Sequence, residues 1–578
     1  MSQRRRPTRA TSSSGSSGRR GIAARVVNSR IRLLLLCIFI AFGAVLARAS
    51  WIATVRASSL AAMAQNQTRS TVVMPAGRGT IFDSMGTPLA LGEQATTVYT
   101  DPNEVVNPLR ESVKAGKILG IKPSVVYRAL TTKHTHFAYV ARKADPAKAT
   151  RLAKLKLPGL HFYAEERRSY PQHSVAAQVL GYAGLDNNGL AGLELELNGA
   201  LTGKNGSQTL VRDPFGHAIS IQNYVPPRHG RSAFLTIDSR IQSNAEQVLR
   251  ATVAKWHAKD ATAIVLDPRT GAILAMAEAP NYDANSFSKA YSHHLTANRA
   301  VSDVYEPGSV FKVVTIAGAL SEHLVTPQTA FTLPPTIQVA DRTIHDAEDR
   351  GTERMTVAQI LQKSSNVGVD TIAIKYLGET RLKKWIKQFG FGQPTGIDFP
   401  GESPGLLPSY WSGSTIGNVP IGQGISVTPI QLASVYGAIA NRGVWTQPHL
   451  VDHVQGIQPP APKTRRILSP AVNRQLLQML KGVVSDAGTA AAAAIPGYTV
   501  AGKTGTAQKP GPHGYEPGKY AATFVGIVPA NSPRLVVLVT VDEPTKAIFG
   551  GVVAAPAFAQ IASFDLQYLE VPPDQPTH

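Results

Sequence analysis

The chain has 578 residues, of which 43% are hydrophobic and 17% charged, a composition typical of a folded protein with room for two to four domains. Its single cysteine, Cys37, excludes an internal disulfide, and the sequence lacks a Cys/His cluster with the spacing of a zinc site. We therefore expect neither a metal nor a cofactor. The net charge of +21 favours anionic surroundings such as lipid headgroups or cell-wall polymers.

Residues 1–32 contain nine arginines and no acidic residue. Their Arg/Ser/Gly-rich start predicts a disordered basic tail, which the positive-inside rule places in the cytoplasm. A basic tail can also bind nucleic acid. Because an apolar run follows the arginines directly, we favour a membrane and expect no nucleic-acid partner.

The apolar run covers residues 33–47 without a charge and, continuing through Arg48 and Trp51, makes residues 33–55 long enough for a transmembrane anchor. Arg48 can snorkel to the surface, and Trp51 suits an interface. The alternative is a cleaved signal peptide, since residues 47–49 loosely fit a small-x-small cleavage site. The arginine-rich leader favours a retained single-pass anchor, with everything after it outside the cytoplasm.

Residues 56–231 mix short strand and helix patterns, such as a strand at 96–100 and a helix at 146–155. Residues 78–86 predict a strand followed by a turn. No nucleophile–base pair stands out in this region. We interpret residues 56–231 as a non-catalytic module, a pedestal of the spacer or dimerisation type.

The pattern changes from residue 232. A strand at 233–237 precedes a helix at 239–255, and the turn at 268–271 separates two strands that predict a β-hairpin, 261–267 and 272–277. Near the end of the chain, strands at 521–528 and 535–541 precede a helix at 556–569. These elements predict an antiparallel sheet with covering helices, and we assign residues 232–570 to one domain and 571–578 to a tail.

Within this domain, a Pro307-Gly308 turn leads into an apolar helical pattern, which places Ser309 at the start of a helix. Ser309 and Lys312 are three positions apart and so share a helix face. A serine hydroxyl becomes a strong nucleophile when a base takes its proton, and a desolvated lysine can be that base. A lone Ser-x-x-Lys also fits an ordinary solvated helix face, so the interpretation depends on companion motifs.

Two companions are present. Ser364-Ser365-Asn366 follows a helix that a capping box opens at residue 356, and Lys503-Thr504-Gly505 follows a strand pattern at 498–501. A strand that carries Lys-Thr-Gly at a sheet edge can pair its backbone with an extended peptide. The trio is the one that penicillin-binding proteins and class A β-lactamases share.

Two further patterns are weighed against it. The glycine-rich stretch 390–396 does not have the spacing of a dinucleotide-binding loop, so we predict a simple loop. The acidic stretch 345–349 could suggest a metal, but a second group of ligands is missing, and we predict none.

The three motifs, in this order, resemble those of the class B penicillin-binding proteins, single-pass peptidoglycan DD-transpeptidases. The likeness extends from the anchor to the last helix and includes residues 78–83, 267–276 and 421–429. It implies an α+β architecture: a transmembrane helix, an elongated mixed α/β pedestal, and a β-lactamase-like transpeptidase domain with an antiparallel sheet against a helical lobe.

The resemblance also implies catalytic roles. Ser309 would attack the penultimate D-Ala carbonyl of a stem peptide ending in D-Ala-D-Ala, with Lys312 as general base. Ser364 and Asn366 would relay protons and hold the substrate amide. An amine from a neighbouring stem would then resolve the acyl-enzyme and create a cross-link.

Substrate-binding roles follow in the same way. Lys503 and Thr504 would bind the carboxylate of the substrate or of a β-lactam, and Gly505 would let the backbone approach closely. The backbone N–H groups of Ser309 and Thr506 would form the oxyanion hole.

The family usually works beside a polytopic glycosyltransferase in the bacterial cytoplasmic membrane, so we expect that partner and other division proteins. Residues 425–429 look more like the division branch than the elongation branch, which is the alternative. Two other functions are considered: a β-lactam hydrolase, for which the sequence does not place a deacylating base, and a sensor or scaffold, which should lack an intact trio or carry an output domain.

Overall fold

The computed structural model describes residues 19–212, 218–512 and 514–575. Its internal contacts divide the described chain into two compact units. The first unit comprises the described residues up to Met74 together with those between Gly206 and Pro226. The second comprises residues 75–205 and those from Pro227 onward, and it contains all three motifs.

The first unit begins with two helices, α1 (Arg19–Thr54) and α2 (Ala57–Thr68). Within α1, the 26 residues Ser29–Thr54 are exposed, and they are long and apolar enough to cross a membrane. A three-stranded antiparallel sheet completes the unit in the order β1 (Arg69–Met74), β8 (Gly206–Arg212) and β9 (Ala218–Val225).

The prediction of a disordered tail over residues 1–32 is only partly testable. Residues 1–18 lie outside the described residues, whereas residues 19–32 are helical, so the prediction is wrong for them. The reason is that a helix, once formed over the apolar segment, gains one backbone hydrogen bond for each residue added, and arginine and alanine are good helix formers.

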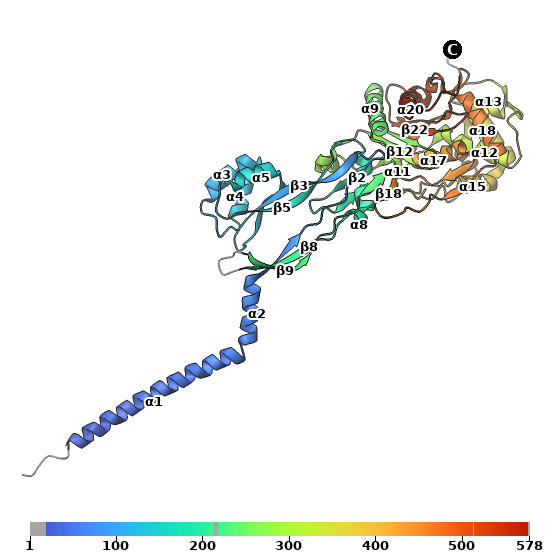
Figure 1. Ribbon diagram of the computed structural model, residues 1–578. Coiled ribbons are helices and arrows are strands. Elements are labelled where there is room, and N and C mark those ends of the chain that lie inside the picture. Colours follow the sequence, from blue (N-terminus) through green and yellow to red (C-terminus); the bar gives the residue numbers. More distant parts are fainter. Residues whose placement is uncertain (1–18, 213–217, 513, 576–578) are drawn as a thin grey trace, which may run out of the picture. The chain divides into compact units, whose positions relative to one another are not determined.

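In the second unit, one sheet has the strand order β18-β10-β2-β3-β4, with β5 also paired to β3. Its strands are β2 (Ile81–Phe82), β3 (Pro88–Thr100), β4 (Ala138–Ala144), β5 (Leu160–Ser169), β10 (Ala233–Leu235) and β18 (Val451–Val454). The helices α3 (Pro108–Leu119), α4 (Pro123–Leu130) and α5 (Pro146–Ala153) cover β3 and β5 on one side (Figure 1). The strand expected at 96–100 and the helix expected at 146–155 are confirmed.

The second sheet is fully antiparallel, in the order β12-β11-β22-β21-β20. Its strands are β11 (Asp260–Leu266), β12 (Ile273–Ala279), β20 (Ala501–Gly511), β21 (Gly514–Val528) and β22 (Leu535–Asp542). The predicted hairpin and the two predicted C-terminal strands are confirmed. The strand pattern at 498–501 is wrong except at its last residue, because the Thr499 N–H donates to Asp574 Oδ1 (2.7 Å) instead of to a neighbouring strand.

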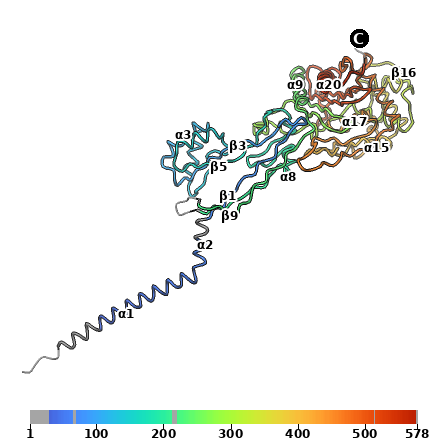
Figure 2. The backbone as a smooth tube through the Cα atoms, in the orientation of Figure 1, coloured from blue at the N-terminus to red at the C-terminus, as the bar shows by residue number. Residues whose placement is uncertain are grey.

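Successive side chains of this sheet enter two different cores, as the alternation of a β-strand requires. Ala263 and Val265 pack with α9 (Ser239–Trp256) and α20 (Ala555–Tyr568), which lie side by side although they come from opposite ends of the domain (Figure 2). Ile264 and Leu266 face the helical lobe instead. The sheet is thus a layer between helices on both faces, an α+β domain as predicted.

The helical lobe carries the first two motifs. Its central elements are the 3₁₀ turn η2 (Gly308–Phe311), α12 (Lys312–Ser321), α13 (Val357–Gln362), α14 (Asn366–Ile372) and α17 (Pro429–Ala440). The capping box at Thr356 is confirmed. Around these elements lie β13 (Ala330–Leu333), β14 (Thr336–Val339), β15 (Arg342–His345), β16 (Glu353–Thr356), α15 (Gly378–Phe389), β17 (Val444–Thr446), β19 (Thr464–Arg466) and α18 (Pro470–Val483). The short helix α19 (Gly550–Val553) lies instead against α20 and the strands β20 and β21.

Candidate active site

Ser309 lies in the tight turn that opens α12. Gly308 has φ +56°, a left-handed conformation that glycine adopts without strain, and its N–H donates to the Gly422 carbonyl (2.9 Å). On the other side of Ser309, the Val310 carbonyl accepts from the Tyr436 hydroxyl (3.0 Å). The half-buried serine is therefore held between two anchored peptide groups.

Lys312 follows one turn later and is fully buried. Its Nζ donates to Asn366 Oδ1 (2.6 Å) and to the Ser364 carbonyl (2.5 Å), and it lies 3.3 Å from Ser364 Oγ. Burial lowers the pKa of Lys312 to about 7, against the opposing effect of the carboxylates Asp346 and Asp370. A substantial fraction of neutral amine at physiological pH follows, and only the neutral amine can accept a proton.

Ser364 and Asn366 occupy the turn between α13 and α14, where the second helix begins at Asn366 with Ser365 as its N-cap. Ser364 has φ +56°, an uncommon conformation for a residue other than glycine. The Asn366 side-chain amide donates to the His345 carbonyl (2.8 Å), which leaves its Oδ1 directed to Lys312. The strained turn and this hydrogen bond aim both motif side chains at the lysine.

Asp346 supports this turn from a distant segment. Its Oδ1 accepts hydrogen bonds from the Asn366 N–H (2.5 Å), the Val367 N–H (3.1 Å) and the Ser365 hydroxyl (3.0 Å). In the sequence, Asp346 lies in the acidic stretch 345–349, which we considered only as a possible metal site and did not favour. Among the described residues, no group of three or more His, Cys, Asp or Glu side chains is arranged to hold a metal ion. No local signal in the sequence distinguished this acceptor role.

The third motif lies on β20, the last strand of the sheet. Lys503 is fully buried, and its Nζ lies 3.4 Å from both the hydroxyl and the carbonyl of Thr504. Burial lowers the pKa of Lys503 well below its usual range, and the charge of Lys312 lowers it further. The Thr504 hydroxyl is also 2.8 Å from that of Thr489, a partner that the motif does not predict.

The edge strand and the serine turn touch each other. A Cβ atom added to Gly505 would lie 2.8 Å from the Pro307 carbonyl oxygen, and one added to Gly308 would lie 3.3 Å from the Thr506 carbonyl oxygen. The Thr506 hydroxyl accepts from the Gly550 N–H (3.1 Å). All eight sequence-predicted site residues, Ser309, Lys312, Ser364, Asn366, Lys503, Thr504, Gly505 and Thr506, thus belong to segments that meet at one place.

Glu306, just before the turn, was not singled out from the sequence. Its Oε1 accepts from the Gly424 N–H and its Oε2 from the Tyr515 hydroxyl, both at 2.9 Å. Burial raises the pKa of Glu306. Glu306 therefore connects the serine turn to the loop that precedes α17 and to β21.

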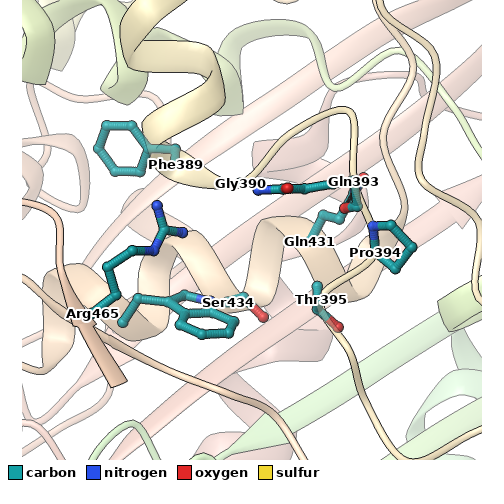
Figure 3. Close-up of a pocket in the computed structure, with 9 residues that line it drawn as sticks. Phe389, Gly390, Gln393, Pro394, Thr395, Gln431, Ser434 and Arg465 are labelled. Atoms are coloured by element: carbon teal, nitrogen blue, oxygen red, sulfur yellow. Dashed lines mark hydrogen bonds between the residues drawn. The ribbon is translucent and has the colours of Figure 1, made fainter. Parts of the chain in front are cut away.

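A small cavity of about 50 Å³ lies elsewhere in the same unit, between the end of α15, α17 and the strands β17 and β19. In Figure 3 the side chains of Phe389, Gln431, Ser434 and Arg465 surround it. One wall is the glycine-rich loop at 390–396, which is a loop as predicted. None of the eight predicted site residues lines this cavity, so it is separate from the motif cluster.

A serine at the start of a helix, a buried lysine whose pKa is lowered to about 7, and an open sheet edge define a serine acyl-transfer enzyme of the penicillin-recognising kind. Comparison with known families agrees. Residues 261–563 match the penicillin-binding protein transpeptidase domain, and residues 73–233 match the penicillin-binding protein dimerisation domain. The chain belongs to the class B penicillin-binding proteins, which are peptidoglycan D,D-transpeptidases.

Curated relatives match along most of the chain. Peptidoglycan D,D-transpeptidase FtsI of Escherichia coli is 31% identical over 562 residues, which cover 95% of this chain and 94% of that protein. Penicillin-binding protein PbpB of Mycobacterium tuberculosis is 35% identical over 556 residues, covering 89% and 81%. Among solved structures, penicillin-binding protein 3 of M. tuberculosis in complex with aztreonam aligns with a TM-score of 0.70 and 31% identity, over 88% of this chain and 99% of that one. Peptidoglycan and β-lactams are accordingly the ligands of this family.

Proposed function

We propose that Ser309 is the nucleophile and Lys312 the general base of D,D-transpeptidation by this chain. The observation that carries the proposal is the buried Lys312 amine, one helical turn from Ser309 and hydrogen-bonded to both Ser364 and Asn366. Lys312 takes the hydroxyl proton as Ser309 Oγ bonds to the carbonyl carbon of the penultimate D-Ala. The backbone N–H groups of Ser309 and Thr506 receive the developing oxyanion.

The second half of the reaction uses the same groups in reverse. Ser364 Oγ, 3.3 Å from Lys312 Nζ, passes the proton on to the departing nitrogen as the peptide bond breaks and D-Ala leaves. Asn366 holds the substrate amide. An amino group of a neighbouring stem peptide then attacks the carbonyl carbon of the acyl-enzyme and gives a proton to Lys312. Lys312 returns this proton to Ser309 Oγ as the ester bond breaks and the cross-link forms.

Recognition of the stem peptide is assigned to β20. Lys503 and Thr504 bind its terminal carboxylate, and Gly505 leaves room for its backbone, which pairs with the free edge of the strand. The buried Lys503 amine has no acidic partner among the described residues. A bound carboxylate would supply the missing charge and favour the ammonium form of Lys503.

The roles of Ser309 and Lys312 are tested by covalent labelling with a fluorescent penicillin. Ser309→Ala should abolish labelling, and Lys312→Ala should reduce it by at least about 100-fold, as expected for loss of a general base. Lys375→Ala, which removes an exposed lysine of the same lobe, serves as the matched control. Thermal unfolding of each variant establishes that it is folded. Labelling of Ser309→Ala at the wild-type rate would reject this nucleophile.

At the cellular level, we propose that the chain works in septal wall synthesis beside a polytopic glycosyltransferase and other division proteins. Residues 33–55 would anchor it in the cytoplasmic membrane with the N-terminus inside, residues 56–231 would serve as the pedestal, and residues 232–570 as the catalytic domain. The pattern at 425–429 supports the division branch over elongation. A fluorescent fusion should concentrate at the septum, and a signal spread along the side wall would favour the elongation role.

A further inference from the structure

A buried carboxylate that the proposed mechanism does not use lies on α14. Asp370 is fully buried, and neither of its oxygens has a hydrogen-bond partner among the described residues. A buried polar group without a partner is costly and rare in folded proteins, so its presence asks for an explanation. Burial raises the pKa of Asp370 well above its usual range, and a positive charge on Lys312 opposes that rise, so the carboxylate form of Asp370 is favoured when Lys312 carries its proton.

Asp370 lies on the side of α14 that is turned to Lys312. Asp370 follows Asn366 by four residues on α14, so the two side chains occupy the same face of that helix. Asn366 Oδ1 is 2.6 Å from Lys312 Nζ, which identifies this face as the one turned to the lysine. The helices α12 and α14 pack directly on each other. Lys312 and Asp370 accordingly interact through their charges.

The other ionisable groups around Lys312 are Asp346, Arg350 and Lys503. Asp346 is occupied by three hydrogen bonds to the turn at Ser365, and Arg350 Nη1 lies 3.9 Å from its other oxygen. A positive charge on Arg350 or on Lys503 opposes a charge on Lys312. Asp370 is thus the one carboxylate of this set that has no hydrogen bond within the described part of the chain.

We propose that Asp370 is a positioning residue for acylation, supplying the counter-charge for the ammonium that forms on Lys312. It touches neither substrate nor Ser309. The proton of the Ser309 hydroxyl moves to Lys312 Nζ as Oγ bonds to the carbonyl carbon, and the new cation is then balanced by the Asp370 carboxylate across the helix interface. The inference rests on the proposed function of Ser309 and Lys312.

The test is the pH dependence of acylation by a fluorescent penicillin, measured on the full-length protein in detergent for wild type and Asp370→Asn. Asparagine keeps the shape and removes the charge. Without the carboxylate the ammonium form of Lys312 is less favourable, so the midpoint of the rate profile should move to lower pH by about one unit or more. The plateau rate should fall by about tenfold, because the transition state loses the same stabilisation.

Asp565→Asn is the matched control. Asp565 is also fully buried with both oxygens unpartnered within the described residues, but it lies on α20. Its replacement should leave the midpoint of the profile unchanged, even if it alters the melting temperature. Asp370→Ser, which introduces a smaller neutral side chain, provides a second variant and should shift the midpoint in the same direction as Asp370→Asn.

The outcomes separate the inference from the function on which it rests. A profile of Asp370→Asn and of Asp370→Ser that overlays wild type, while Lys312→Ala remains inactive, would overturn the role of Asp370 alone. Full acylation of Lys312→Ala would instead overturn the proposed general base. A shift shared by Asp565→Asn would show a general effect of buried charge on stability and would also overturn the assignment.

Discussion

At the scale of single residues, the proposed chemistry of this site depends on one buried amine. Lys312 is fully buried, and its pKa of about 7 results from burial, partly offset by Asp346 and Asp370. An exposed lysine would be almost entirely protonated at the same pH and could not act as a base. The surrounding acceptors, the Ser364 carbonyl and Asn366 Oδ1, hold the amine in place in either protonation state.

This burial predicts the pH dependence of acylation. Below a pH of about 7 Lys312 is mostly ammonium and inactive as a base, so the second-order rate of penicillin acylation should rise through that pH and level off above it. Stopped-flow labelling across the range would show the rise. A rate that stays flat between about pH 5 and pH 9 would contradict deprotonation by this lysine.

Individual residues also mark how far the sequence could predict the site. The three motifs predicted that Ser309, Lys312 and Asn366 would belong to one site, because the motif spacing is local and chemically specific. Asp346 and Asp370 were missed for opposite reasons. Asp346 reaches the turn at Ser365 from a separate segment, a non-local contact, whereas Asp370 looks like an ordinary polar position of a helix until its burial is known.

At the scale of elements, the sheet edge and the serine turn can lie close together because Gly505 has no side chain. Gly505 faces the Pro307 carbonyl oxygen so closely that an added Cβ would lie 2.8 Å from it. Both backbone segments are held in place. The Gly308 N–H donates a hydrogen bond to the Gly422 carbonyl, and β20 pairs along its length with β21. The spacing between strand and turn is therefore fixed by the glycine.

Gly505→Ala should push β20 away from the turn and slow acylation by about tenfold or more, since small displacements of catalytic groups are costly in rate. The sheet itself should remain folded. Gly351→Ala is the control, because an added Cβ there meets nothing within 4 Å. Penicillin-labelling rates and melting temperatures of both variants provide the measurement, and an unchanged rate for Gly505→Ala would show that the two elements are not tightly fitted.

The elements themselves were largely predictable. The hairpin of β11 and β12 and the helix α20 have strong periodicity and clear turn residues, and both were found. The start of β20 was predicted too early. The Thr499 N–H donates a hydrogen bond to Asp574, near the end of the chain, instead of to a neighbouring strand. The helical state of residues 19–32 was missed because local composition does not show the helix that continues into them.

At the scale of the whole molecule, the candidate membrane helix and the candidate active site belong to different units. The apolar helix belongs to the first unit, and all predicted site residues belong to the second. The core around the serine turn is built from residues of the second unit alone. The predicted site residues should therefore keep their arrangement without the N-terminal helix.

Removal of residues 1–56 should release the protein from the membrane fraction and leave the rate of penicillin acylation within about twofold of wild type, since neither the described core nor the site loses a contact. Fractionation followed by labelling checks both parts. A truncated protein that stays soluble and folded but reacts slowly would indicate that the helix contributes to the site.

The position of β20 at the end of its sheet has a consequence for inhibition. One row of its amide and carbonyl groups has no neighbouring strand within the sheet. Any rigid, extended compound with a terminal acid could hydrogen-bond there in the manner of an added strand, whether or not it contains a strained ring. Such a compound would bind mainly to main-chain atoms of β20, the same atoms that would pair with the stem peptide. Side-chain substitutions in the enzyme would therefore weaken its binding little without also weakening binding of the stem peptide.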